Sequence, residues 1–201
     1  MAAGGSAVDT AEAAVNVLEN DPTFYARYGS VLTADQGIEM DAIVMDGRTL
    51  NAGTVAGVTS VRNAVSLAKA VKDETSHTLI VGAGADKIAR KFGIEEVGVQ
   101  QLVTKAAQDE WDLFAASGAG AYGNTVDSLF TSQLAPALLL VQILIQMQMQ
   151  RIPNLANTQR AASASTATET SLRLTSTGGI TFKVPGRVGD SPIIGAGCYA
   201  Q

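Results

Sequence analysis

The residues best suited to chemistry stand near the C-terminus, in a stretch rich in glycine and proline. Residues 175–179 read Thr-Ser-Thr-Gly-Gly, and Arg187 and Asp190 follow in a loop framed by Pro185 and Pro192. An arginine offers a planar fork of donors to a carboxylate, whereas an aspartate can hold an ammonium group. Arg187 and Asp190 therefore predict a clamp for an amino acid. The alternative from their spacing is an exposed ion pair that contributes little to stability.

Other reactive side chains give weaker signals. His77 has no partners for a catalytic triad, so we expect a hydrogen-bonded residue at the end of a strand. Cys198 stands without a second cysteine or histidine nearby and is predicted to be a small buried residue. Asp41 and Asp46 are five residues apart in a run with strand character and would face opposite sides. They do not predict a paired acid and base.

The composition excludes several classes of function. A net charge of −5 without a basic run gives no footprint for nucleic acid or for an anionic membrane surface. The most apolar segment, residues 138–145, is shorter than the roughly 20 residues of a membrane helix. The first residues lack the pattern of a secretory signal, and a single cysteine fits a reducing compartment. We expect a globular protein of the cytoplasm.

The elements that must position the clamp begin with a helix and a hairpin. Val8, Ala11, Val15 and Leu18 recur at helical spacing and predict an amphipathic helix over residues 6–18. Short apolar runs with strand character follow, with Asp-Gly at positions 46–47 between the last two, which is typical of a hairpin. The runs cover residues 30–33, 38–45 and 49–58.

Further along, helices and a strand alternate. Asn63 is a candidate N-cap for a helix, and residues 77–81 predict a buried strand. Residues 82–85, Gly-Ala-Gly-Ala, lack the third glycine of a dinucleotide fingerprint and predict a structural turn. Helices over residues 86–92 and 101–114 follow. Together these elements predict helices layered on a sheet.

The middle of the chain differs in composition from both flanks. Residues 117–123 are glycine-rich and resemble a linker. An apolar block follows, then alternating Gln and Met over residues 146–150, then an Ala/Ser/Thr-rich run over residues 161–171. Strand character returns from residue 172. The predicted division is residues 1–114, then an atypical region 115–174, then residues 175–201.

Ordered motifs in both flanks resemble one family. The N-terminal flank contains Gly-Ser-Val-Leu-Thr at 29–33, Glu-Met-Asp-Ala at 39–42, Val-Met-Asp-Gly at 44–47 and His-Thr-Leu-Ile-Val-Gly at 77–82. The C-terminal flank contains Thr-Ser-Thr-Gly-Gly at 175–179, Gly-Arg-Val-Gly-Asp-Ser-Pro at 186–192 and Gly-Ala-Gly-Cys-Tyr at 195–199. In this order they resemble plant-type asparaginases and isoaspartyl peptidases, which are amidohydrolases with an N-terminal threonine nucleophile. The last two motifs are the most specific.

The resemblance implies an α/β fold, an αββα four-layer sandwich of the Ntn-hydrolase type, here incomplete. It implies a precursor that cuts itself to expose a threonine, which attacks asparagine or a β-aspartyl dipeptide. By motif, Thr177 supports the nucleophile, while Arg187 and Asp190 bind the substrate's α-carboxylate and α-ammonium groups. It implies a homodimer and no cofactor beyond a structural monovalent cation between Glu19 and Phe24.

The sequence also departs from the family pattern. No Thr-Val-Gly occurs, and the nucleophile slot counted back from Arg187 holds Gln159. The family's opening strand should precede Gly4 but is absent, so the chain is predicted to be truncated. Because it lacks the nucleophile motif, it is also predicted to be inactive. The alternative is a non-catalytic fragment that binds an amino acid or pairs with an intact homologue. A third hypothesis makes Thr158 a displaced nucleophile.

One hypothesis accounts for the atypical region. If the reading frame is shifted by one base, residues 163–171 can spell a strand close to the one that follows the family's nucleophile. The same shift permits threonine at position 159. A transcript that encodes residues 115–180 in frame would contradict this hypothesis.

Overall fold

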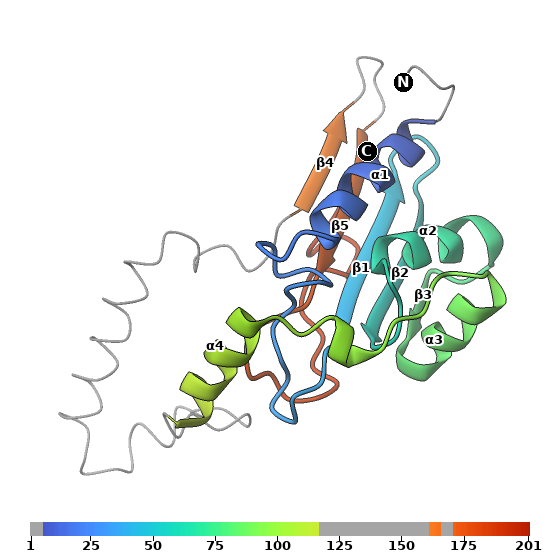
Figure 1. Ribbon diagram of the computed structural model, residues 1–201. Helices are drawn as coiled ribbons and strands as arrows, with labels where there is room; N and C mark the ends of the chain where they lie inside the picture. The colour runs from blue at the N-terminus through green and yellow to red at the C-terminus, as the bar shows by residue number, and fades with distance from the viewer. Residues whose placement is uncertain (1–5, 117–160, 166–170) are drawn as a thin grey trace, which may run out of the picture.

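The computed structural model describes residues 6–116, 161–165 and 171–201, which form a sheet with helices on one face (Figure 1). Five strands lie in the order β3-β2-β1-β5-β4, with β2 and β3 parallel and the other neighbours antiparallel. Their bounds are β1 Met40–Asp46, β2 Asn51–Val58, β3 Leu79–Val81, β4 Ala161–Ser165 and β5 Ser171–Thr177. The two strands nearest the predicted clamp, β1 and β5, are both interior.

Strand β1 forms the centre of the core because both of its faces are apolar. Ala42 and Val44 point into the main cluster, beneath the helices. Ile43 and Met45 point to the opposite face, where the C-terminal segment covers them with Cys198 and Ala200. Successive side chains of a strand alternate between faces, so this run of apolar residues buries the sheet on both sides.

The predicted hairpin is confirmed. Asp46 pairs with Asn51, and residues 47–50 form the turn between β1 and β2. The second strand begins later than its apolar run because Leu50 has a φ of +58°, which no extended strand allows.

Among the described residues, four helices accompany the sheet: α1 Ala7–Glu19, α2 Ala64–Glu74, α3 Gly82–Lys91 and α4 Lys105–Ala116, with a 3₁₀ turn at Val99–Gln101. Helix α1 begins with a capping box, in which Ser6 and Asp9 exchange side chain to backbone hydrogen bonds. Helix α1 packs over β5 and β4, and α2 over β1 and β2 (Figure 1). The predicted first helix and the helix after Asn63 are confirmed.

Three local predictions were wrong. Residues 30–33 form no strand, because only Thr33 makes a single bridge, to Lys183. The strand in residues 77–81 is shorter than predicted and not buried: Leu79 and Val81 are 50% and 55% exposed, since β3 lies at the end of the described sheet. Residues 82–85 are the first turn of α3 rather than a separate turn.

The mixed α/β class is confirmed, and a sheet with one helical layer is consistent with part of an Ntn-hydrolase sandwich. The predictions for residues 117–160 lie outside the described residues. Within the described part of the chain, no helix is long and apolar enough to cross a membrane.

Candidate functional site

Thr177 is the last residue of β5 and is buried. Its Oγ1 accepts a hydrogen bond from the Gly179 N–H at 3.0 Å. The turn after it requires small residues: a Cβ at Gly178 would lie 2.5 Å from the Ser30 Oγ, and Gly179 has a φ of +86°. The Thr-Gly-Gly sequence therefore fixes the direction in which the chain leaves the sheet.

Arg187 and Asp190 both lie in the following segment, residues 184–192, which we call the clamp loop. Both side chains are exposed. The Arg187 N–H donates to the Val184 carbonyl at 3.0 Å, and the Asp190 carbonyl accepts from the Ile193 N–H at 2.9 Å. The Arg187 guanidinium lies over Gly189, where a Cβ would be 3.2 Å from Nη1. The clamp loop thus presents one cationic and one anionic side chain to solvent.

Three charged residues lie beneath the clamp loop: Glu39, Asp41 and Lys183. The Lys183 side chain is fully buried, and that of Glu39 is 15% exposed. Asp41 is 0% exposed. Two carboxylates and one ammonium group in one place are rare in a protein interior, where charged groups must be paired.

Asp41 connects the two parts of the candidate site. Its backbone pairs with Thr177 across β1 and β5. Its carboxylate accepts the Gly57 N–H at 2.9 Å and lies 3.5 Å from the Gly189 N. The structure therefore brings Thr177 and the clamp loop, which carries Arg187 and Asp190, to the same end of the central strands.

Burial sets the electrostatics of this end of the sheet. It raises the pKa of Asp41, against the hydrogen bond from Gly57 and the positive charges of Lys183 and Arg187. It lowers the pKa of Lys183, against the charges of Asp41 and Glu39. Each buried charge thus depends on its neighbours of opposite sign.

Another buried carboxylate, Glu19, is hydrogen-bonded to Ser176, the residue before Thr177 in β5. It is 0% exposed and accepts hydrogen bonds from Ser176 Oγ, from Asn63 Nδ2 at 2.8 Å and from the Val65 N–H at 3.0 Å. Burial raises its pKa more than these donors lower it. The sequence predicted that Asn63 caps α2. Asn63 does stand at the N-cap position, but its side chain donates to Glu19 and makes no capping hydrogen bond.

The segment between Glu19 and Phe24 was predicted to hold a monovalent cation. The carbonyl oxygens of Pro22 and Phe24 converge beside Gly29, within 2.5 and 2.8 Å of where its Cβ would be. These contacts require glycine at position 29, and the cation itself stays a prediction from the resemblance. No cluster of three or more His, Cys, Asp or Glu side chains suited to a metal occurs in the described residues.

The remaining candidates lie apart from the clamp. His77 is exposed and precedes β3. Cys198 is buried on the far face of the sheet, as predicted, and burial raises the pKa of its thiol. Gln159 lies outside the described residues. The strand β4 begins two positions after it, with Ala161 opposite Thr175 of β5.

Sequence reasoning missed Glu39 and Lys183. Two signals were available. Glu39 and Asp41 alternate at the start of an apolar strand, and Lys183 stands between apolar residues just before the clamp loop. A charged residue in an apolar run is a candidate for a buried, paired charge.

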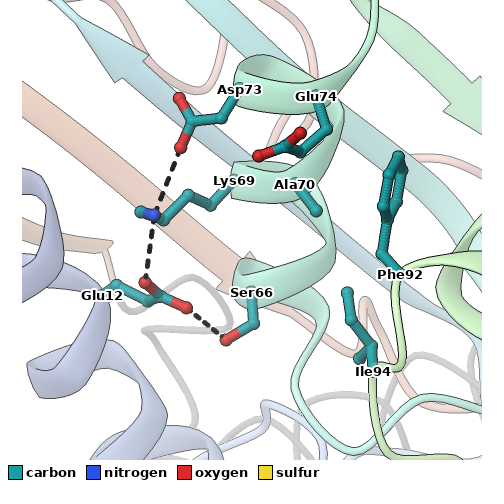
Figure 2. Close-up of a pocket in the computed structure, with 8 residues that line it drawn as sticks. All are labelled: Glu12, Ser66, Lys69, Ala70, Asp73, Glu74, Phe92 and Ile94. Carbon is teal, nitrogen blue, oxygen red and sulfur yellow. Dashed lines mark hydrogen bonds and ion pairs between the residues drawn. The ribbon is translucent and has the colours of Figure 1, made fainter.

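A separate pocket of about 330 Å³ lies on the helical side of the molecule (Figure 2). Figure 2 shows Lys69 between Glu12 and Asp73, with which it forms ion pairs of 3.9 and 3.2 Å. Glu12 also accepts the Ser66 hydroxyl at 2.6 Å. Because its one lysine is already paired with carboxylates, and no clamp residue lines it, this pocket is not the candidate site.

Comparison with known proteins decides the family. The family model described as asparaginase matches residues 1–201 of the chain. The chain belongs to the asparaginase family. The isoaspartyl peptidase/L-asparaginase of Mus musculus is 40% identical over 201 residues, covering 100% of this chain and 53% of that protein.

Other members of the asparaginase family show similar agreement. The plant-type L-asparaginase of Pyrococcus furiosus is 39% identical over 197 residues, covering 98% of this chain and 58% of that protein. The isoaspartyl peptidase of Escherichia coli is 38% identical over 201 residues, covering 100% and 56%. The chain thus spans little more than half the length of the curated asparaginase-family proteins that it matches.

Proposed function

We propose that this chain binds a free amino acid with an acidic or amide side chain, such as aspartate or asparagine. Arg187 holds the α-carboxylate through its guanidinium fork, and Asp190 holds the α-ammonium group. The supporting observation is that both side chains stand exposed on one short loop, which Asp41 connects to Thr177. The family membership and the named relatives, which are isoaspartyl peptidases and asparaginases, agree with this ligand class.

We also propose that the chain does not hydrolyse the amide. An N-terminal-nucleophile hydrolase needs a threonine whose hydroxyl attacks the substrate carbonyl and whose amine accepts the proton. The slot predicted for it holds Gln159, and a glutamine amide is not a nucleophile. Thr177 in this proposal keeps only a supporting role, with its hydroxyl directed by Gly179.

Titration calorimetry with L-aspartate tests the binding. We expect measurable binding to the unmodified chain and about tenfold or greater weakening in Arg187→Ala, because a hydrogen-bonded ion pair is lost. Arg48→Ala is the matched control, since Arg48 is an exposed arginine on the hairpin. Equal affinities in Arg187→Ala and the unmodified chain, or no binding by either, would refute the clamp.

Release of aspartate from asparagine and from an isoaspartyl dipeptide tests the absence of hydrolysis, with the Escherichia coli isoaspartyl peptidase as positive control. We expect no release and, by mass spectrometry, an intact chain of 20.7 kDa. Cleavage before Thr158 together with release of aspartate would instead support Thr158 as a displaced nucleophile.

Three accompanying properties are part of the proposal. A homodimer, or pairing with an intact homologue, is expected from the resemblance. A cytoplasmic location is inferred from the single cysteine and is checked by cell fractionation.

A monovalent cation between Glu19 and Phe24 predicts a higher melting temperature in sodium chloride than in choline chloride. Equal melting temperatures in the two salts would contradict the cation site.

A further inference from the structure

The clamp loop contains no helix or strand of its own, so its shape depends on contacts with other parts of the fold. Its turns are formed by backbone hydrogen bonds, such as the one from the Arg187 N–H to the Val184 carbonyl. Such a loop holds two side chains in a fixed geometry only if the body of the protein restrains it. The residues beneath it are therefore as important to a clamp as the two that face the ligand.

Glu39 holds the loop on the Arg187 side. Its two carboxylate oxygens accept the Gly186 N–H at 2.8 and 2.9 Å. Gly186 is the residue before Arg187 and has a φ of +85°, where glycine is favoured. A hydrogen bond to a carboxylate is roughly twice as strong as one to a neutral acceptor. Glu39 therefore fixes the backbone from which the Arg187 side chain departs.

Asp41 holds the loop on the Asp190 side. Its Oδ2 lies 3.5 Å from the N of Gly189, the residue before Asp190, and its Oδ1 accepts the Gly57 N–H at 2.9 Å. The first contact is the longer one, so we expect Asp41 to restrain the loop less strongly than Glu39. Glu39 immediately precedes β1, and Asp41 is the second residue of that strand.

Lys183 holds the two carboxylates in place. Its Nζ donates to the Glu39 carbonyl at 3.0 Å and lies 3.7 Å from the Glu39 Oε2. It lies near enough to Asp41 for their charges to shift one another's pKa. Because the Lys183 side chain is fully buried, its ammonium charge is stabilised by these partners rather than by water.

We propose that Glu39, Asp41 and Lys183 form an ionic anchor whose role is to position Arg187 and Asp190. Glu39 is the positioning residue for the carboxylate half of the clamp, and Asp41 for the ammonium half. None of the three contacts the ligand. This inference rests on the proposed function for its effect on binding, but the restraint on the loop is a property of the protein alone.

The two halves predict different losses of selectivity. Succinate is aspartate without the ammonium group, and β-alanine is aspartate without the α-carboxylate. Glu39→Gln should reduce the preference for L-aspartate over β-alanine by about tenfold, and Asp41→Asn should reduce the preference over succinate by a smaller factor. A purely structural role would weaken all three ligands equally.

The restraint itself is measured by hydrogen exchange in the absence of ligand, with peptides that cover residues 184–192. We expect exchange to become about tenfold faster in Glu39→Gln and less so in Asp41→Asn, with the rest of the sheet unchanged. Glu95→Gln is the control, because Glu95 forms an exposed ion pair with Arg62 away from the loop. If Asp41→Asn unfolds, the partly exposed Glu39 still provides the test.

The outcomes separate the anchor from the clamp. Faster exchange in the loop with the selective losses supports both. Faster exchange in a chain that binds no aspartate supports the anchor and refutes the proposed function. Unchanged exchange in folded Glu39→Gln overturns the anchor, whether or not aspartate binds.

Discussion

At the scale of single residues, positive φ angles show where a side chain is in conflict with its backbone. Leu50 adopts a φ of +58° in the hairpin and is 56% exposed, so it gains little from burial. Asparagine tolerates this conformation better than leucine. We expect Leu50→Asn to stabilise the fold by about 1 kcal/mol in urea unfolding. Leu50→Ala keeps the strain and should give no gain; an equal gain would contradict the explanation.

The buried carboxylate of Glu19 predicts a dependence of stability on pH. Burial raises its pKa above the ordinary 4.5 in the folded protein. Its contribution to stability is therefore complete below about pH 4.5 and is lost as the pH rises through the folded pKa. Glu19→Gln does not titrate, so its stability relative to the unmodified chain should rise with pH above about 4.5. Urea unfolding across pH checks the direction, and a relative stability that falls with pH would contradict it.

At the scale of elements, the contact between α2 and β2 depends on a missing side chain. A Cβ at Gly53 would lie 2.2 Å from the Ala68 carbonyl oxygen and 2.3 Å from the Lys72 N, both atoms of the helix backbone. The strand and helix would have to separate to admit a methyl group. We expect Gly53→Ala to destabilise the fold by about 3 kcal/mol. Gly98→Ala, where no atom lies within 4 Å, is the control and should change little.

Periodicity predicted α1, α2 and β1 correctly because the helices each pack one apolar face into the main cluster, and β1 packs one face there and the other against the C-terminal segment. It failed over residues 30–33, where Val31 and Leu32 are buried without joining a ladder. Burial and strand pairing give the same apolar signal, so sequence alone cannot separate them. The prediction of a turn from the glycines at residues 82–85 also failed, because glycine can begin a helix as well as end one.

In the candidate site, too, the sequence predicted some parts and not others. The types and spacing of Arg187 and Asp190 suggested a clamp without any structure. The anchor beneath it could not be predicted in this way, because Glu39 and Gly186 are 147 positions apart in the sequence. Contacts of that range depend on the order β2-β1-β5 in the sheet, which no local pattern encodes. The part of the site that faces a ligand was therefore easier to infer than the part that supports it.

At the scale of the whole molecule, the edge of the sheet at β3 is the feature that bears on association. Its outward Leu79 and Val81 are about half exposed, and β3 has no further strand beside it within the described residues. An open edge with apolar side chains favours pairing with another chain, whereas lysine at such an edge opposes it. We therefore expect this edge to contribute to the proposed homodimer.

Sedimentation equilibrium measures this association directly. We expect the average mass of the unmodified chain to rise with concentration from 20.7 kDa towards twice that value. The double variant Leu79→Lys with Val81→Lys should stay monomeric, because the added charges would have to be buried at the edge. Val17→Lys places one lysine on the exposed face of α1, where Val17 is 67% exposed, and should associate like the unmodified chain. If the double variant associates as strongly, the contact between copies does not involve the β3 edge.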